Sequence, residues 1–311
     1  MFRISWLFYL MVSFVMNRQM MASFHNGMDA LMRQCKKIGL QNFITIKDTE
    51  QFQYGSLFYV ILMYVFSIVV LLLSLNVYGW GFLNLAKSFT NAIDVLYGTI
   101  AIVLIYYMFV IYDKIFRRIL NAIRDDFELR KMRFEYDIAP NRWNYFADKL
   151  KQYQKIYPAF SLNYEYQIVG YGNFFFIIWH FILAIISQIF CMSYLVVLIS
   201  GNADFNAEIF GEFIYCIGLI GFSYYICKKS SDITNLSNDL ISYIYKYPIT
   251  KLTLEEANLV ESLLLVLHTH KPKMAIFDIF TVRKSIIPSV VGQVVTYGLV
   301  ALQFNILDAY K

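Results

Sequence analysis

Long apolar runs dominate the pattern of hydrophobic and polar positions along this chain. A membrane-spanning helix needs about 20 mostly apolar residues, because the hydrocarbon core is about 30 Å thick and each residue rises about 1.5 Å. Five runs have that length, and a sixth, at the N-terminal end, is shorter. Backbone groups in lipid must be paired within the chain, so each run predicts a helix. The predicted spans are 4–16 (short), 57–78, 91–112, 173–199, 208–227 and 285–307.

Composition supports a membrane protein. Of the 311 residues, 59% are hydrophobic, 18% aromatic and only 16% charged, whereas an average soluble domain has about 25% charged residues. These values exclude an ordinary water-soluble enzyme and a disordered chain. We therefore expect one all-α polytopic membrane unit over residues 1–311, with six or seven transmembrane helices.

The positions of Lys and Arg predict the orientation of the spans. Three segments, 17–56, 113–172 and 228–284, hold 24 of the 27 basic residues. Basic loops stay in the cytoplasm, so the C-terminus is expected outside a plasma membrane. The net charge of +5 follows from these loops and indicates topology; it does not indicate a nucleic-acid partner.

Segments 113–172 and 228–284 carry apolar residues at helical spacing, so we expect cytoplasmic helices there. A capping box at Thr253–Glu256 opens one of them. Two interpretations stay open: these helices pack on one another, or they form an anchor that holds subunits together. The residues predicted for the anchor are Trp143, Phe146, Leu150, Leu259 and Leu263.

The last predicted span has a polar face. On a helical wheel, small or polar side chains from Ser289 to Gln303 share an arc of about 100°, and the other faces are apolar. Polar side chains in a lipid-embedded helix must face protein or water. The arc therefore indicates either close helix packing or the lining of an aqueous pore. One such helix cannot enclose a pore, so the second interpretation requires several copies around an axis.

The same span contains Thr296-Tyr297, five mostly apolar residues, and then Gln303-Phe304. This phrase, a few residues from the C-terminus, resembles the C-terminal signature of the insect gustatory receptor family. The resemblance implies a seven-helix subunit with an external C-terminus, and a homo- or hetero-tetrameric, ligand-gated cation channel. It implies that the last helix lines the pore, which passes monovalent and divalent cations. The residues then expected at the pore are Ser289, Gln293, Thr296, Tyr297, Gln303 and Phe304.

The N-terminal end departs from the family pattern. The run at 4–16 corresponds to a shortened second span, and no counterpart of the first span is seen. The alternatives are a short isoform, a truncated gene model or a divergent relative. A signal peptide at 4–16 would export 17–56, which conflicts with the positive charge of that segment.

The outer halves of the spans are the predicted binding region for an external small molecule, here a tastant. Aromatic and polar side chains there could stack on the ligand and hydrogen-bond to it. The alternative is an aromatic belt at the membrane interface, in contact with lipid. The candidates are Asn76, Tyr78, Trp80, Asp94, Tyr97, Tyr194, Glu212 and Tyr215.

No sequence pattern indicates an enzyme. Nucleotide loops, the His-Glu-x-x-His metal motif and the Gly-x-Ser-x-Gly nucleophile motif are missing, and we expect no cofactor and no metal. The rival classes are a G-protein-coupled-type chemoreceptor, a transporter, and a non-conducting accessory subunit. A G-protein-coupled receptor would require a cytoplasmic C-terminus, which the distribution of basic residues disfavours.

Overall fold

A computed structural model gives the fold of the chain. It describes residues 22, 26–37, 81–135, 143–169, 207–276 and 280–309, with isolated positions at 61, 65, 68, 69 and 72 and between 182 and 198. The predicted span 4–16 lies outside the described residues. Spans 57–78 and 173–199 do so apart from those isolated positions.

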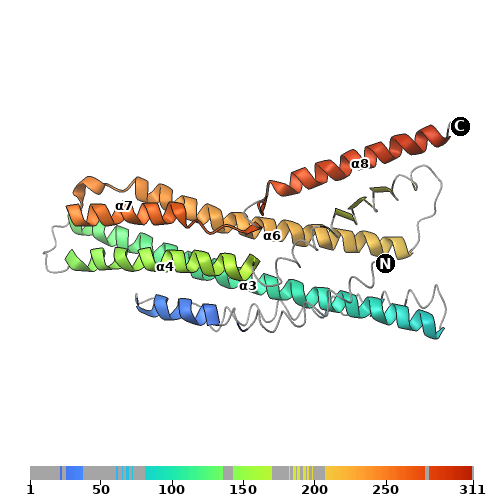
Figure 1. The fold of residues 1–311 in the computed structure, drawn as a ribbon, viewed down its shortest axis with the longest axis horizontal. Helices are drawn as coiled ribbons and strands as arrows, with labels where there is room; N and C mark the ends of the chain where they lie inside the picture. The colour runs from blue at the N-terminus through green and yellow to red at the C-terminus, as the bar shows by residue number, and fades with distance from the viewer. Residues whose placement is uncertain are drawn as a thin grey trace.

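Long helices make up the described chain (Figure 1). Helix α3 alone has 54 residues. A 3-10 turn, η2, precedes α7, and two strands of two residues each, β1 and β2, pair antiparallel between α7 and α8. The elements are α3 Phe82–Glu135, α4 Trp143–Val169, α6 Ala207–Tyr245, η2 Ile249–Lys251, α7 Leu254–Thr269, β1 Ala275–Ile276, β2 Phe280–Thr281 and α8 Ile286–Ala309.

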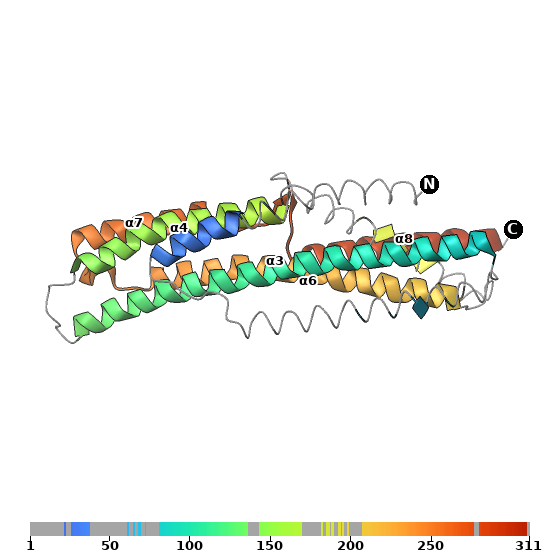
Figure 2. The ribbon, with the colours of Figure 1, turned by 90° about the horizontal axis from the view of Figure 1, so that it is seen from below.

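The helices form an elongated molecule with a bundle at one end (Figures 1 and 2). There α4 packs along α7, and the C-terminal halves of α3 and α6 complete the bundle. At the other end, α8 lies beside α6, and the two helices diverge toward the C-terminus of α8 (Figure 1). A shorter helix at 26–37 packs on the bundle through Met28, Leu31 and Cys35.

The bundle core includes apolar positions at the helical spacing that the sequence shows in segments 113–172 and 228–284. In α3, Phe116, Ile119, Ile123 and Phe127 are completely buried. The matching residues of α4, α6 and α7 close the same core. They are Phe146, Leu150, Tyr153 and Tyr157 of α4, Ile233, Leu240 and Ile244 of α6, and Leu263 and Leu267 of α7. The structure thus confirms that segments 113–172 and 228–284 contain helices and that each helix buries an apolar face.

The turn between α6 and α7 also follows the sequence. Helix α6 ends at Tyr245, three residues before Pro248, whose ring cannot continue a helix. Thr253 then caps α7: its hydroxyl accepts the Glu256 backbone N–H, and the Glu256 carboxylate accepts the Thr253 N–H. The predicted capping box is present.

A buried ion pair fixes α7 against α3. The Arg130 guanidinium donates to Glu256 Oε2 over 2.8 Å, and both side chains are nearly inaccessible, at 6% and 3% exposure. Glu256 thus serves the cap and the ion pair with the same oxygen. Because charges in a core are costly unless paired, this contact strongly constrains how α7 docks.

In the described part of the chain, the β1–β2 pair is the only regular structure that is not helical, which confirms the all-α prediction there. Within the described residues, no helix has both the length and the apolar character that a membrane crossing requires. The helix at 26–37 and the β1–β2 pair were not predicted from the sequence.

We predict that Glu256→Ala destabilises the protein by about 3–5 kcal/mol, because it leaves a buried guanidinium without its carboxylate. Its neighbour provides a matched control. Glu255 pairs with Lys151 at the surface, where the carboxylate side chain is 70% exposed, so Glu255→Ala should cost about 0–1 kcal/mol. Thermal unfolding of the purified full chain, followed by circular dichroism, measures both. Equal stability of the two variants would contradict the assigned role of the ion pair.

Candidate functional site

Among the described elements, helix α8 contacts mainly α6. Among its described side chains only Val294, at 5% exposure, belongs to the buried hydrophobic set. Gly298 faces Met192: a β-carbon built there would lie 3.3 Å from the Met192 methyl carbon. At Gly292, by contrast, an added β-carbon would meet nothing within 4 Å. One edge of α8 therefore touches its neighbours, and most of its circumference is uncovered.

The polar stripe predicted on this helix lies on its exposed part. Ser289, Gln293, Thr296 and Gln303 are all exposed. The Ser289 hydroxyl donates to the Ser285 carbonyl oxygen over 3.2 Å, and the Thr296 hydroxyl donates to that of Gly292 over 2.9 Å. These bonds within the helix satisfy both hydroxyls, so neither donates its proton to another helix in this structure.

The apolar faces of α8 are exposed as well. Tyr297 is 62% exposed and Leu299 58%, and Val291, Val295 and Val300 are each above 40%. A single chain thus leaves both kinds of surface on α8 uncovered. Phe304 lies on the same helix, but its side chain is outside the described residues, so its predicted place at a constriction stays a prediction.

The predicted ligand residues fall where side chains are not described. Asn76, Tyr78, Trp80 and Tyr194 lie outside the described residues. The helical position of the other four is given: Asp94 and Tyr97 belong to α3, and Glu212 and Tyr215 belong to α6. Whether these side chains form one pocket therefore stays a prediction.

The residues predicted for a subunit anchor lie inside the bundle of one chain. Phe146 is 3% exposed, and Leu150 and Leu263 are completely buried. Leu259 is partly buried against the same core; Trp143 begins α4, and its side chain is not described. The three buried side chains therefore pack within one chain, as the first of the two interpretations predicts. A role in subunit assembly stays a prediction, and these three residues would affect assembly by stabilising the bundle.

Tyrosine hydroxyls connect the helices of the bundle. Tyr153 of α4 donates to Asp126 of α3 over 2.5 Å, and Tyr243 of α6 donates to Glu128 of α3 over 2.6 Å. Burial and the adjacent carboxylates raise the pKa of both hydroxyls far above the ordinary value of a tyrosine. They therefore remain protonated donors at physiological pH.

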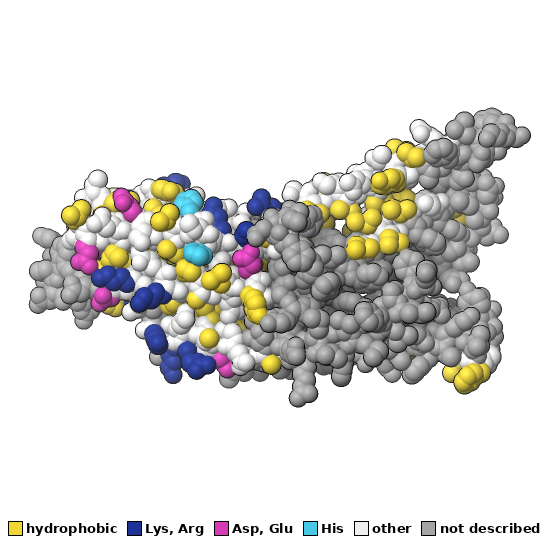
Figure 3. All heavy atoms as spheres, in the orientation of Figure 1, with side chains coloured by type: hydrophobic (Ala, Val, Ile, Leu, Met, Phe, Trp, Pro, Cys, Tyr) yellow, Lys and Arg dark blue, Asp and Glu magenta, His cyan; other side chains and the backbone are white. Residues whose placement is uncertain are grey.

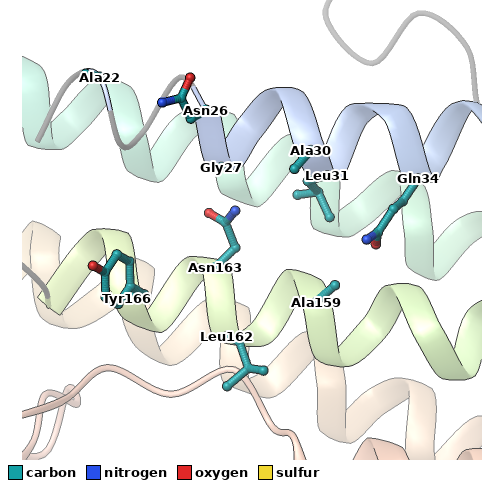
Figure 4. Close-up of a pocket in the computed structure, with 10 residues that line it drawn as sticks. All are labelled: Ala22, Asn26, Gly27, Ala30, Leu31, Gln34, Ala159, Leu162, Asn163 and Tyr166. Atoms are coloured by element: carbon teal, nitrogen blue, oxygen red, sulfur yellow. The ribbon is translucent and has the colours of Figure 1, made fainter.

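A groove of about 910 Å³ lies between the helix at 26–37 and α4 (Figure 4). Small side chains let the two helices approach, and three amides lie along the groove. Asn163 points from α4 toward the facing helix, and its side-chain oxygen accepts the Tyr112 hydroxyl over 2.5 Å. The lining residues are Ala22, Asn26, Gly27, Ala30, Leu31, Gln34, Ala159, Leu162, Asn163 and Tyr166.

The described groove lining contains no carboxylate, histidine or cysteine, and no group of described His, Cys, Asp and Glu residues could hold a metal ion. The lining is suited to packing and amide hydrogen bonds. Sequence reasoning missed the helix that forms one wall of the groove, although Met28, Leu31 and Cys35 recur at the three- and four-residue spacing of a buried helical face.

We predict that Leu263→Ala destabilises the chain by about 2–5 kcal/mol, because it opens a cavity in a packed core. Leu265, two positions along α7, is 65% exposed and supplies the control: Leu265→Ala should change stability by about 0.5 kcal/mol or less. Chemical unfolding of the detergent-solubilised chain measures the difference. If Leu263→Ala alters subunit number at unchanged stability, the residue contacts another subunit, and its packing role is wrong.

The environment of Cys35 gives a test of the helix at 26–37. Burial raises the pKa of the Cys35 thiol to about 11, from 9.0. Each pKa unit is a factor of 10, so below pH 9 the reactive thiolate is about 100-fold rarer than for a thiol at the ordinary value. Iodoacetamide at pH 8 should leave Cys35 largely unmodified in the folded chain and modify it after unfolding, as read by peptide mass spectrometry. Rapid modification of the folded chain would mean that this helix does not dock as described.

The features that the structure brings together are thus an uncovered helix with a polar stripe, a helical bundle with a tightly packed core, and a groove on that bundle. No protein-family model and no curated protein matches the sequence.

Proposed function

We propose that this chain is a subunit of a ligand-gated, non-selective cation channel of the gustatory receptor type. The observation that carries the proposal is the position of the signature residues. Thr296, Tyr297 and Gln303 lie on one helix, α8, and they are exposed together with the polar stripe that begins at Ser289. Several copies of such a helix around an axis would line a water-filled path.

The proposed chemistry is permeation. The side-chain amides of Gln293 and Gln303 and the hydroxyl oxygens of Ser289 and Thr296 present neutral dipoles, which can replace part of the hydration shell of a cation. Side-chain oxygens from a few positions surround an ion less completely than stacked rings of backbone carbonyls do, which fits a non-selective pore. The proposal needs no cofactor and no metal.

Gating would begin on the extracellular side of the membrane. A tastant bound between the outer halves of the spans would stabilise one arrangement of the helices over another. Such a shift could reach the pore through α6, which contacts α8, and through the segment that carries Met192, which faces Gly298 of α8. In this mechanism the pore widens near Gln303 and Phe304.

The bundle would supply a rigid base for this movement. Helices α3 and α6 continue without interruption from the predicted spans 91–112 and 208–227 into the bundle. At about 1.5 Å per residue, α3 is about 80 Å long, much longer than a bilayer is thick. We therefore place the bundle on the cytoplasmic side of the plasma membrane and the C-terminus outside, as the basic loops predict.

We predict that Gln303→Ala changes the permeability ratio of monovalent to divalent cations several-fold, because it removes an amide from the proposed constriction. Reversal potentials in cells that express the chain, stimulated with a panel of sugars, bitter compounds and carbon dioxide, provide the measurement. Val295→Ala is the matched control, since residue 295 lies about 110° from the centre of the polar stripe.

A C-terminal epitope tag completes the experiment. Antibody staining of intact cells is expected, and it shows that each variant reaches the surface in the proposed orientation. Staining only after permeabilisation, with surface delivery confirmed independently, would refute the proposed topology. Unchanged ion selectivity of a conducting Gln303→Ala channel would refute the pore assignment.

A further inference from the structure

Three basic segments from distant parts of the sequence lie next to one another, at the same position along the long axis of the molecule. They are 113–118 of α3, 228–232 of α6, and 283–284 just before α8. Lys229 Nζ lies 3.6 Å from Asp113 Oδ2 and joins α6 to α3. Lys284 joins the third segment to α6: its backbone N–H donates to the Ser231 hydroxyl oxygen, and its ammonium group donates to Asp232, each over 3.0 Å.

These segments carry a strong excess of positive charge. They contain seven Lys and Arg residues and two Asp residues. Asp113 contacts Arg117 as well as Lys229, and Asp232 contacts Lys284, so both carboxylates are already engaged. We refer to the seven basic residues as the basic collar: Lys114, Arg117, Arg118, Lys228, Lys229, Arg283 and Lys284.

Four of the seven collar side chains are exposed, and those of Lys114, Arg118 and Lys229 are partly buried. Lys228 and Arg283 are exposed, and the side chains of Arg117 and Lys284 keep 50% and 44% of their surface accessible although both are in ion pairs. A carboxylate that holds one edge of a guanidinium leaves its other N–H groups free to bind a second anion. The collar therefore presents positive charge outward.

The collar marks a boundary on the surface of the molecule. On its bundle side the described surface carries many Lys and Arg side chains, whereas the described part of α8 shows hydrophobic side chains and no charge (Figure 3). One to two helical turns from the collar, within the ends of the predicted spans 91–112 and 208–227, Tyr106 of α3 is 39% exposed and Tyr224 of α6 is 48% exposed. Tyrosines followed by basic residues are typical of the interface where hydrocarbon meets headgroups.

We propose that the basic collar binds the anionic headgroups of phospholipids in the cytoplasmic leaflet. This inference rests on the membrane placement given under the proposed function. Guanidinium groups can pair with a phosphate through two parallel N–H bonds, and ammonium groups contribute compact charges. Anionic lipids attract basic residues that lie close to the membrane surface.

The arrangement gives the bound lipid a structural effect. The collar joins α3, α6 and the residues that lead into α8, and the ion pairs of Lys229 and Lys284 already connect these three segments. A phosphate headgroup bound across the three segments adds ion pairs with the collar, on the exposed side of the place where these segments meet. Anionic lipid therefore stabilises the start of the pore helix relative to the bundle.

The test uses the full chain in dodecyl maltoside. Its thermal unfolding is followed as dioctanoyl phosphatidylserine or dioctanoyl phosphatidylcholine is added. The expected result is a rise in the unfolding temperature with phosphatidylserine and a much smaller one with phosphatidylcholine. The double variant Lys228→Glu/Arg283→Glu should bind phosphatidylserine about tenfold more weakly or worse, because two attractive charges become repulsive.

A matched variant controls for total charge. Lys246 and Lys251 are exposed at the far end of the bundle, so Lys246→Glu/Lys251→Glu makes the same charge change away from the collar and should leave phosphatidylserine binding unchanged. Equal loss in both variants, or equal stabilisation by the two lipids, would overturn the proposal. Equal stabilisation by inorganic phosphate would also overturn it, because the ligand would then be a free anion.

Two further measurements separate the possible failures. If the glutamate variant loses helical content by circular dichroism, Lys228→Gln/Arg283→Gln removes the charge without reversing it and must still weaken phosphatidylserine binding. Current recordings of the unmodified chain test the proposed function on its own. Selective lipid binding without current would refute the proposed channel function and support the proposed lipid site. Current without lipid selectivity would support the channel function and refute the lipid site.

Discussion

The aromatic contacts along α3 are the interaction on which the rest of the bundle depends. The Phe116 ring stacks on Phe160 of α4 with centroids 4.7 Å apart. Further along α3, the Phe127 ring contacts Phe146 of α4 and Tyr247 edge to face, at 5.2 and 4.9 Å. Large aromatic side chains bury much apolar surface and prefer such offset or edge contacts. Helix α3 thus provides the surface against which the neighbouring helices align.

Apolar contacts alone specify the register of packed helices only weakly, and buried polar contacts specify it more strictly. Tyr157 of α4 shares a hydrogen bond of 2.6 Å with Ser237 of α6 inside the core. The Arg130–Glu256 pair is more demanding, because a shift of α7 by one turn would leave two buried charges unpaired. In this protein the ion pair selects one register of helices that hydrophobic contacts alone would hold less specifically.

Helix α8 contrasts with this bundle. The bundle closes its own core, whereas α8 keeps Tyr297, Leu299 and the polar stripe uncovered. Exposed apolar surface of this extent on a helix is usually covered by lipid or by another protein surface. That contrast is the physical reason for proposing several copies around an axis. The collar lies between the bundle, which closes its own core, and the helix whose described surface is uncovered.

Local patterns in the sequence determined much of this architecture. The spacing of Phe116, Ile119, Ile123 and Phe127 defined a buried helical face, and Pro248 with the Thr253 capping box fixed where α6 ends and α7 begins. These signals depend on neighbours within a few residues, so they can be read without the fold. The polar stripe of α8 is of the same kind, because its members are separated by whole helical turns.

Only the tertiary structure decided which elements meet. Arg130 and Glu256 are 126 positions apart, and the collar joins α3 to residues just before α8. The groove also needs two segments, Asn26 to Gln34 and Ala159 to Tyr166, whose sequences give no sign of each other. Helical periodicity shows that a face is buried but does not identify the surface that covers it, because many apolar faces have similar shapes. That choice comes from the packing of the whole chain, where a buried charge such as Arg130 finds its partner on a helix distant in the sequence.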